Sequence, residues 1–447
     1  MGDDGRGFTR RLASFVVASQ KGSIPREAFD HAKVAFMDWL GVTFAGKDDP
    51  LVLKLVGYTH LVGGSAQATV IGHGMKTDVS HASLINGSAS HTLDYDDTLV
   101  SCLGHPSVTL FPSLLALSEW KNLPGDDFLT AYLVGLQVGG TVGACASLDH
   151  YLAGWHATST LGHIASAAGC AKLLGLDEEK TCWAIGIGAT QACGLKRVFG
   201  TMCKPFHAGR ASQAGLMAAL LAGMGFTSAE DAVEGPQGFF ETLRGTVKED
   251  VIGMLGLGWD VVNLSQKYHA SCHATHSPME ASLAAVNDNA IKPDEIETIT
   301  VHASELALQA AGKRTPGHGL EGKFSIPYCV ANALIRGVTG MKAFTDEAVN
   351  DPEVRGFMEK IEVVHDGSMK ALESLVEVRT RDGRTYTAFS DILQQIPPYE
   401  IKKTRVESKF LDLAAPVVGR EKAERIMDEI CHLEQVRDMA ELALDFS

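Results

Sequence analysis

This chain of 447 residues has few aromatic side chains, no excess of positive charge and no long apolar run. Aromatic residues make up 7% of the chain, whereas glycine alone supplies 46 residues. Small residues in this quantity favour closely packed helices over β-sandwiches. The formal charge of −15 at pH 7 repels nucleic acid and anionic membranes, so neither is expected as a principal partner. An anionic substrate would require basic residues gathered in one pocket.

The cysteine pattern and the apolar segments bear on the compartment. The nine cysteines include no C-x-x-C pair and are odd in number, so the disulfide framework of a small secreted protein is absent. The N-terminal residues lack the apolar stretch of a signal peptide. The longest apolar stretch, residues 216–226, is about half of what a membrane span needs. These absences predict a soluble cytoplasmic protein with reduced thiols.

The first 263 residues show helix-like apolar spacing and no convincing alternating strand. Hydrophobic residues at 45% and charged residues at 21% are ordinary globular values and exclude general disorder. At roughly 150 residues per domain, the length suggests two or three domains. Thr227 and Glu230 resemble a capping box that begins a further helix. The helix-like stretches before them are 8–46, 50–63, 80–93, 107–120, 126–150, 157–175 and 209–225.

After Asn263 the pattern changes to short alternating runs between helix-like stretches. The alternating runs are 296–303, 359–366 and 375–388, the last folded around Asp382-Gly383, which is a strong hairpin signal. The helix-like stretches are 275–288, 326–337 and 345–358, and a charged amphipathic helix is expected over 417–446. The sequence therefore predicts an α+β two-domain protein, with a large all-α domain and a smaller lid domain whose sheet is mostly antiparallel. The predicted bounds are 1–263 with 400–447 for the all-α domain and 264–399 for the lid.

The segment HTLDYDDTLVSCLGHPS places Asp94, Asp96, Asp97, Thr98 and His105 in one short stretch. Three carboxylates so close together either bind a cation or are compensated by other groups. One interpretation is helix capping, since Asp and Thr satisfy free N–H groups at a helix start. A divalent metal is a second interpretation, although D-x-D-D lacks the EF-hand pattern. In a third, Asp94 is a base or a positioning group and backbone donors hold the other carboxylates.

The segment AGWHATSTLGH places His156 just before a run of threonine and serine. The pattern predicts a loop that enters a helix at its N-terminus, where backbone N–H groups collect anions. An ordinary helix cap with an incidental histidine is the alternative. Tyr151 lies just before this segment and could supply a phenol.

The segment KRVFGTMCKPFHAGRASQAG concentrates five potential cations in an acidic protein: Lys196, Arg197, Lys204, His207 and Arg210. Its proline and glycines predict a loop followed by a helix, an arrangement that suits a polycarboxylate or a phosphate. The glycines match neither a P-loop nor a dinucleotide fingerprint, so a nucleotide is disfavoured. A solvated charged loop is the alternative. The apolar neighbours of Lys204 indicate partial burial, and a partly desolvated lysine can act as an acid or a base.

The segment QKYHASCHATHSPME carries His269, His273 and His276, with Cys272 beside them. Spacings of four and three residues permit a zinc site, to which Glu280 could add a ligand only on a continuing helix. Acid–base histidines that face an anion, and histidines that cap or pack, are the alternatives. The segment lies at the predicted domain junction, where pockets are common.

These segments, together with FSIPY, resemble the MmgE/PrpD family, which includes 2-methylcitrate dehydratase, cis-aconitate decarboxylase and iminodisuccinate epimerase. The blocks, in the family's order, are HTLDYDDT with HPS, GWHATSTLG, FGTMCKPFHAG, the stretch from Lys267 to His276, and FSIPY. The resemblance implies an all-α domain with an α+β lid, a homodimer and no cofactor. It implies an active site between the domains, built from Asp94, Thr98, His105, His156, Lys204, the histidines at 273 and 276, and Tyr328. Without the resemblance, Tyr328 would be taken as a core aromatic residue.

Two departures from the family pattern bear on the reaction. One extra residue separates Thr98 from His105 in comparison with the decarboxylase pattern. His269 and His273 stand where dehydratase-like members tend to have proline and arginine, which argues against dehydration of 2-methylcitrate.

The shared chemistry is removal of a proton next to a carboxylate, which requires stabilised negative charge, a base and an acid. We therefore predict a cofactor-independent isomerase or lyase for a small polycarboxylate, leaning towards an epimerase of the iminodisuccinate type because several bases are available. A dehydratase or decarboxylase of a citrate/aconitate-type acid is the alternative. The predicted catalytic residues are Lys204, His156, His273, Tyr151 and Asp94, and the predicted substrate-binding residues are Thr98, His105, His207, His276 and Tyr328, with no metal ligand.

Two other classes of function remain open from the sequence. One is a metal-dependent hydrolase or lyase that uses the histidines at 269, 273 and 276. The other is a binding module without catalysis, against which the full set of acid–base groups argues.

Overall fold

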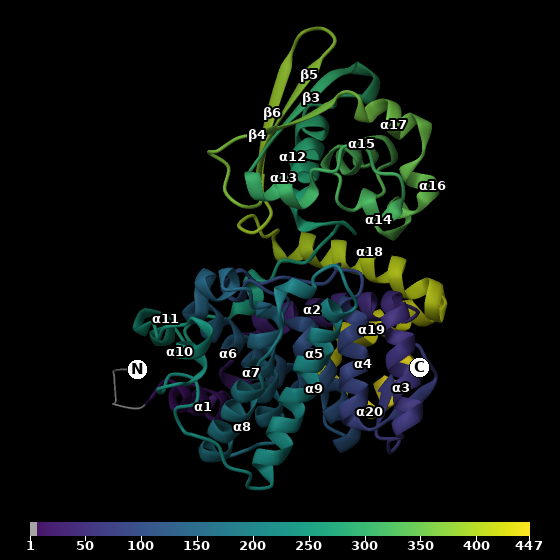
Figure 1. The fold of residues 1–447 in the computed structure, drawn as a ribbon. Coiled ribbons are helices and arrows are strands. Elements are labelled where there is room, and N and C mark those ends of the chain that lie inside the picture. Colours follow the sequence, from purple (N-terminus) through teal and green to yellow (C-terminus); the bar gives the residue numbers. More distant parts are fainter. Residues whose placement is uncertain (1–6) are drawn as a thin grey trace. The chain divides into compact units, whose positions relative to one another are not determined.

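The computed structural model describes residues 7–447, apart from the side chain of Ser147. The chain forms two compact units. The helical unit lies within Met1–Gln266 and Tyr399–Ser447, and the mixed unit is Lys267–Pro398. Figure 1 shows many packed helices in the first and a small sheet with helices beside it in the second. The predicted two-domain α+β fold class is confirmed.

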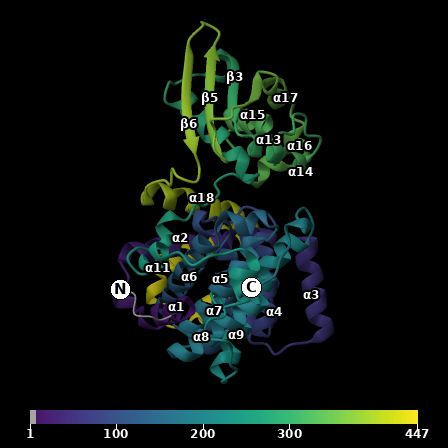
Figure 2. The same cartoon turned by 60° about the vertical axis from the view of Figure 1, so that its left-hand side comes forward.

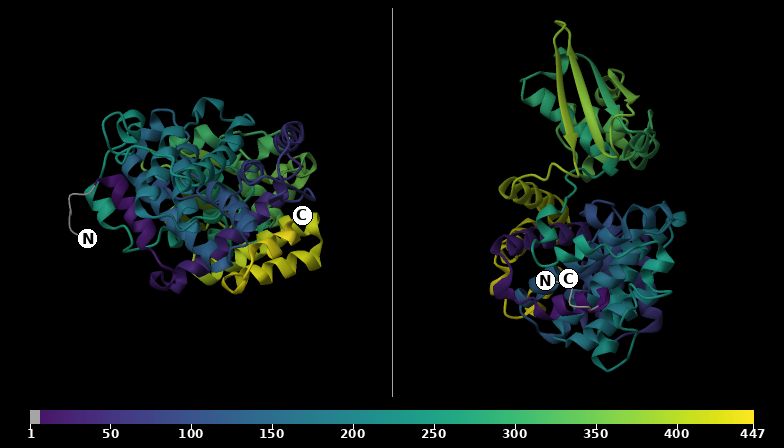
Figure 3. Two further views of the ribbon diagram at one scale, coloured as in Figure 1. Left: turned by 90° about the horizontal axis from the view of Figure 1, so that it is seen from below. Right: turned by 90° about the vertical axis from the view of Figure 1, so that its left-hand side faces the viewer.

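The helical unit is built mainly from long helices, and the helices of the C-terminal segment, 399–447, belong to it as well. The long helices are α1 Phe8–Ala18, α2 Arg26–Gly46, α3 Pro50–Val62, α4 Val79–His91, α5 Ser107–Lys121, α6 Gly125–Leu152, α7 Ala157–Leu173, α8 Glu178–Gln191 and α9 Cys203–Gly223. Shorter or closing helices are α10 Phe239–Leu243, α11 Glu249–Gly253, α18 Tyr399–Val418, α19 Arg420–Cys431 and α20 Met439–Ala443. Figure 3 shows the C-terminal helices, in yellow, lying side by side.

Small residues let α4, α7 and α9 pack closely, and this packing brings three helix ends together. A Cβ on Gly87 of α4 would lie 2.7 Å from the Cα of Gly209 on α9. Gln213 of α9 donates to Ser80 of α4 at 3.0 Å, so the two helices run antiparallel and the end of α4 meets the start of α9. Ser166 of α7 donates to a carbonyl near the middle of α9, while Ser159 does so near its start, so α7 and α9 run parallel and begin together.

Helix α6 is long and apolar enough, over Gly125–Ala146, to cross a membrane by length and composition. However, 94% of its apolar window is buried inside the structure. This is the environment of a core helix in a soluble-type fold, because a lipid-facing helix would expose that surface.

Several local expectations for the helical unit are wrong. A short hairpin, β1 Ala68–Val70 with β2 Met75–Thr77, lies where no strand was predicted, because three-residue strands are too short to show alternation. The predicted helix over 8–46 is broken between α1 and α2, and no helix begins at Thr227, since the next one, α10, begins at Phe239. Helix α8 was not predicted.

The mixed unit carries a four-stranded sheet in the order β4-β3-β5-β6. Figure 2 shows β3, β5 and β6 side by side. The strands are β3 Ile296–Ala303, β4 Ile361–His365, β5 Glu373–Thr380 and β6 Thr385–Asp391; the helices are α12 His276–Asn287, α13 Glu305–Ala311, α14 Gly319–Gly322, α15 Ile326–Arg336, α16 Asp346–Val349 and α17 Pro352–Met358. The β3–β5 and β5–β6 pairs are antiparallel, whereas β3–β4 is parallel. Residues of α12, α15, β3 and β5 share one apolar core.

Candidate active site

The loop after α4 and the first turn of α9 are joined by an ion pair between Asp94 and Lys204. The Lys204 ammonium donates to Asp94 Oδ1 at 2.7 Å. The side chain of Lys204 is 20% exposed and that of Asp94 is 39% exposed, so the pair stays open to solvent. Asp94 has a left-handed backbone with φ of 52°, a conformation that non-glycine residues adopt at a small energetic cost. The predicted loop-to-helix transition lies at Cys203, where α9 begins.

Asp96, two residues after Asp94, is buried and contacts two histidine rings. His91 Nδ1 lies 3.0 Å from both carboxylate oxygens of Asp96, and His105 Nδ1 lies 2.9 Å from Oδ2. Burial raises the pKa of Asp96, but the attraction and hydrogen bonds of the two histidines outweigh burial and keep it well below its usual range. Burial lowers the pKa of His91 to about 4. The Nε2 atom of His105 lies 3.9 Å from Asp94 Oδ1, so the two carboxylates flank one ring.

His156 is the N-cap residue of α7 and lies beside the start of α9. Its Nδ1 atom is 3.1 Å from His207 Nδ1, and its ring meets the edge of Phe199 with 4.9 Å between centroids. Burial, then the positive charge of neighbouring groups including Lys204, lowers the pKa of His156 far below its ordinary value. Burial also lowers the pKa of His207. Both rings are therefore neutral at physiological pH.

Tyr151 and Thr98 lie at the edges of the same cluster. The Lys196 ammonium lies 3.5 Å from the centre of the Tyr151 ring and donates to the Tyr151 carbonyl at 3.1 Å. Burial raises the pKa of Tyr151, with opposing effects from Lys204 and Asp94. Thr98 pairs with Ser265 through its backbone, at 2.8 and 2.9 Å. Its hydroxyl is buried and has no hydrogen-bond partner among residues 7–447.

Asp97 belongs to a different environment from Asp94 and Asp96, although the three are close in sequence. Its carboxyl group accepts from the Ser107 hydroxyl, which also contacts Tyr132. Burial raises the pKa of Asp97 well above its usual range. Its carboxyl group bonds the first residue of α5, Ser107.

In the mixed unit the structure brings His269, His273 and His276 together around a separate network. The His276 ring lies edge to face with the other two, at centroid distances of 5.0 Å to His269 and 4.9 Å to His273. His269 contacts Glu280 at 3.1 Å and Thr339 at 2.8 Å. Burial, then the charge of the neighbouring histidines, lowers the pKa of His276 well below its ordinary range.

Tyr328, in the first turns of α15, is fully buried and its hydroxyl donates to the Ala343 carbonyl. Burial raises the pKa of Tyr328. Within the mixed unit it is thus a core residue, as its aromatic side chain alone suggested, and its predicted contact with substrate stays a prediction.

One group among the described residues has donor atoms close enough to share a metal ion, and it is not the histidine cluster of the mixed unit. It comprises His91, Asp94, Asp96 and His105, whose donor atoms all lie within 4.8 Å of one another. A dication there would compete with the Lys204 ammonium for Asp94 and with both histidines for Asp96. The two carboxylates are therefore already engaged by side chains of this protein.

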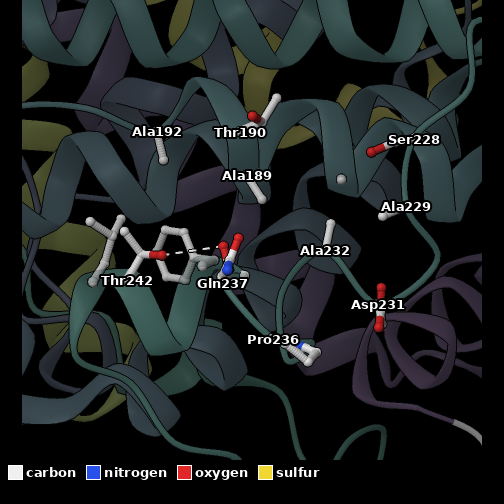
Figure 4. Close-up of a pocket in the computed structure, with 14 residues that line it drawn as sticks. Ala189, Thr190, Ala192, Ser228, Ala229, Asp231, Ala232, Pro236, Gln237 and Thr242 are labelled. Carbon is white, nitrogen blue, oxygen red and sulfur yellow. Dashed lines mark hydrogen bonds between the residues drawn. The ribbon is translucent and has the colours of Figure 1, made fainter.

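A cavity of about 410 Å³ lies elsewhere in the helical unit, between α8 and the segment that leads into α10 (Figure 4). Its wall is mostly small and neutral, with Thr190, Ser228, Gln237 and Thr242 as polar members. Asp231 is its one ionisable lining residue. A wall without a cation does not suit a polycarboxylate, and none of the predicted site residues lines this cavity.

The sequence did not identify His91 as a site residue, nor Asp96 as its partner. Their five-residue spacing spans a helix end, and the contact depends on how the chain turns after α4. The one sequence feature that could have indicated His91 as a site residue is that it is the first residue of the HTLDYDDT block.

Comparisons with known proteins give one consistent result. The MmgE/PrpD N-terminal domain matches residues 10–250, and the MmgE/PrpD C-terminal domain matches residues 269–435. A cis-aconitate decarboxylase-like protein of Aspergillus oryzae is 27% identical over 97% of this chain and 96% of its own. Cis-aconitate decarboxylase of Mus musculus is 27% identical over 92% of this chain and 87% of its own. Cis-aconitate decarboxylase of Aspergillus terreus is 25% identical over 98% of this chain and 95% of its own.

Proposed function

The chain belongs to the MmgE/PrpD family, and from this premise we propose that it is a lyase for a small polycarboxylate of the citrate/aconitate class. Decarboxylation of a cis-aconitate-like acid is the first candidate, because that activity is named for relatives that span nearly the whole chain. We further propose that it works without a cofactor, as a homodimer in a reducing compartment. The nine cysteines, which form no disulfide within residues 7–447, support the last point.

The observation that carries the proposal is the cluster of Lys204, Asp94, His105 and His156 in a protein of net charge −15. A fixed ammonium on the first turn of α9 can bind a substrate carboxylate that the protein as a whole repels. The start of α7 beside it adds backbone N–H groups, which also favour an anion. A polycarboxylate is therefore the class of substrate that this cluster suits.

His105 is the group best placed to exchange a proton. Two carboxylates flank its ring, Asp96 at 2.9 Å and Asp94 at 3.9 Å, and they can balance the charge of a protonated imidazole. His156 differs, because its burial keeps it neutral and suits it to donate or accept a hydrogen bond.

These roles account for a decarboxylation with balanced atoms. When the bond to the departing carboxylate breaks, CO₂ leaves and the electron pair of that bond stays on the carbon framework. Lys204 stabilises the negative charge that develops. One proton from the acid then reaches carbon, and solvent restores the acid. Dehydration uses the same groups, with the base removing a proton and the acid protonating the hydroxide that leaves.

The expected lean towards an epimerase gains no support from the relatives, whose names are those of decarboxylases. Epimerisation would require a second group that returns the proton to the opposite face of the same carbon. Epimerisation is therefore one of the outcomes that the following experiment distinguishes.

Proton NMR in D₂O, with chelator-treated protein, tests the proposal. The substrates are cis-aconitate, citrate, 2-methylcitrate and iminodisuccinate stereoisomers. Decarboxylation gives CO₂ and a product with one carbon fewer; dehydration gives a new olefinic signal. Interconversion of stereoisomers alone would replace the lyase proposal by epimerisation, and silence on every acid would contradict it.

A further inference from the structure

His91 and Asp96 are buried beside the candidate site, and each side chain is about 1% exposed. His91 ends α4, and Asp96 lies on the loop between Asp94 and the bridge at Thr98. A buried carboxylate that bonds two histidines restricts which ring nitrogen of each can carry a hydrogen.

The tautomer of His105 follows from its two acceptors. Its Nδ1 atom lies 2.9 Å from the backbone carbonyl of Asp97 and 2.9 Å from Asp96 Oδ2. A carbonyl oxygen can only accept, so Nδ1 must carry the hydrogen. The neutral ring therefore has its lone pair on Nε2, the atom on the side of Asp94.

The tautomer of His91 follows from the charge of Asp96. An ionised carboxylate only accepts hydrogen bonds, and both Asp96 oxygens lie 3.0 Å from His91 Nδ1. That nitrogen must therefore carry the hydrogen as well. The Nε2 atom of His91 is buried and has no hydrogen-bond partner within the described part of the chain. Its ring lies 4.7 Å from the His105 ring and 6.0 Å from the His156 ring, centroid to centroid.

We propose that Asp96 is a positioning residue that fixes His91 in the Nδ1–H tautomer and, together with the Asp97 carbonyl, orients His105 in the same tautomer, so that each Nε2 is a proton acceptor. His105 then exchanges a proton with substrate at Nε2, and His91 adds a second acceptor deeper in the same cluster. The inference rests on the proposed function for its catalytic consequence, but the tautomers can be measured without any substrate.

The first test is ¹⁵N–¹H correlation NMR of protein with ¹⁵N-labelled histidine, which distinguishes the two tautomers by their nitrogen shifts. Single His91→Gln and His105→Gln variants assign the two rings. We expect both rings of the wild type as Nδ1–H. In Asp96→Asn the amide must donate one N–H, and His91 Nδ1 is the acceptor within reach, so His91 should switch to Nε2–H. His105 should not switch, because the Asp97 carbonyl still holds its Nδ1 hydrogen. Wild-type rings in the Nε2–H form would overturn the inference even if Asp96→Asn failed to fold.

The second test is the kinetics of Asp96→Asn on whichever acid the wild type turns over. We expect kcat to fall about 10²-fold, the usual range for lost acid–base assistance, because an asparagine cannot balance the charge of a protonated His105. KM should stay within about threefold, because Asp96 is buried. Glu119→Gln is the matched control: Glu119 is also a buried carboxylate, but it bonds Thr69 and Lys76 and contacts neither histidine. It should keep kcat within about twofold.

The two tests separate failure of the inference from failure of the proposed function. Equal kcat for Asp96→Asn and Glu119→Gln, with normal wild-type turnover, would refute the role of Asp96 and leave the lyase proposal standing. If the wild type turned over none of the acids, the lyase proposal would fall, and the tautomer measurement would still decide the structural part of the inference.

Discussion

Replacing Lys409 by methionine tests whether the C-terminal helix α18 holds the loop that carries Asp94. The Lys409 ammonium lies 2.6 Å from Asp38 on α2 and donates to the Tyr95 carbonyl at 2.6 Å. It also lies 3.9 Å from the centre of the Tyr95 ring. The side chains of Lys409 and Asp38 are 3% and 1% exposed, so this ion pair is shielded from water, and Tyr95 directly follows Asp94.

The expected loss follows from the charge left behind. Methionine keeps most of the length of the lysine chain but removes its charge, so Asp38 becomes a buried carboxylate without its ammonium. Removing one partner of a buried ion pair raises the free energy of the folded state by about 3–5 kcal/mol, a large share of the about 5–15 kcal/mol of a typical domain. The substitution Asp38→Asn removes the remaining buried negative charge. The double variant K409M/D38N should therefore be about 1–3 kcal/mol more stable than K409M alone.

Urea unfolding followed by tryptophan fluorescence measures this loss in the helical unit alone. All 5 tryptophans, at positions 39, 120, 155, 183 and 259, lie in that unit. K403M is the matched control, because Lys403 lies on the same helix in a partly exposed pair with Glu407 and should lose less than about 1 kcal/mol. If K409M were as stable as K403M, or if D38N destabilised K409M further, the buried pair would not support the loop.

Three further predictions concern charge, pH and metal. K204M should lower turnover by about 10²–10³-fold and change the free energy of unfolding by less than about 1 kcal/mol, because its pair with Asp94 is partly exposed; near-normal steady-state turnover would exclude Lys204 as a catalytic residue. Burial lowers the pKa of His31, His91 and His163 to about 4 each, whereas the same histidines in the unfolded chain take up a proton near pH 6.5. Their contribution to the free energy of unfolding is therefore fully present above pH 6.5 and is lost as the pH falls towards 4. Each should contribute a loss of about 2 kcal/mol between pH 6.5 and 4.5, and stability that stayed constant in fluorescence-monitored urea titrations over this range would contradict the burial. Chelation should leave turnover unchanged, whereas a stoichiometric metal lost together with activity, by elemental analysis, would favour a metal-dependent reaction.

The fold was predictable where a segment's own pattern is long and regular. The alternating run 296–303 corresponds to β3, Ile296–Ala303, and the turn at Asp382-Gly383 joins β5 to β6. Gly383 has a φ of +87°, as a tight hairpin turn requires. The parallel pairing of β3 with β4 could not be predicted, because it depends on which edge of β3 remains open after β5 has paired.

Several residues of the candidate site, though not His91, could be named from the sequence, but their contacts could not. Lys204 was expected to be partly buried in a loop before a helix, and the structure places it in the first turn of α9 beside Asp94. This contact forms because glycine-mediated packing brings the end of α4 to the start of α9. The partners of His91 and His105 depend on the same packing, and no spacing along the chain encodes it.

The position of the Asp94 carboxylate is set by two lysines from two helices. Its left-handed backbone is costly for a residue with a Cβ, and such a conformation persists only where surrounding contacts determine it. Lys204 fixes the side chain from 110 residues away, and Lys409 fixes the next carbonyl from 314 residues away. Loss of Lys204 removes one ion pair from the carboxylate but leaves the backbone held, whereas loss of Lys409 removes a hydrogen bond from the backbone on which the carboxylate depends. The C-terminal helix α18 therefore takes part in placing Asp94, through the contacts of Lys409.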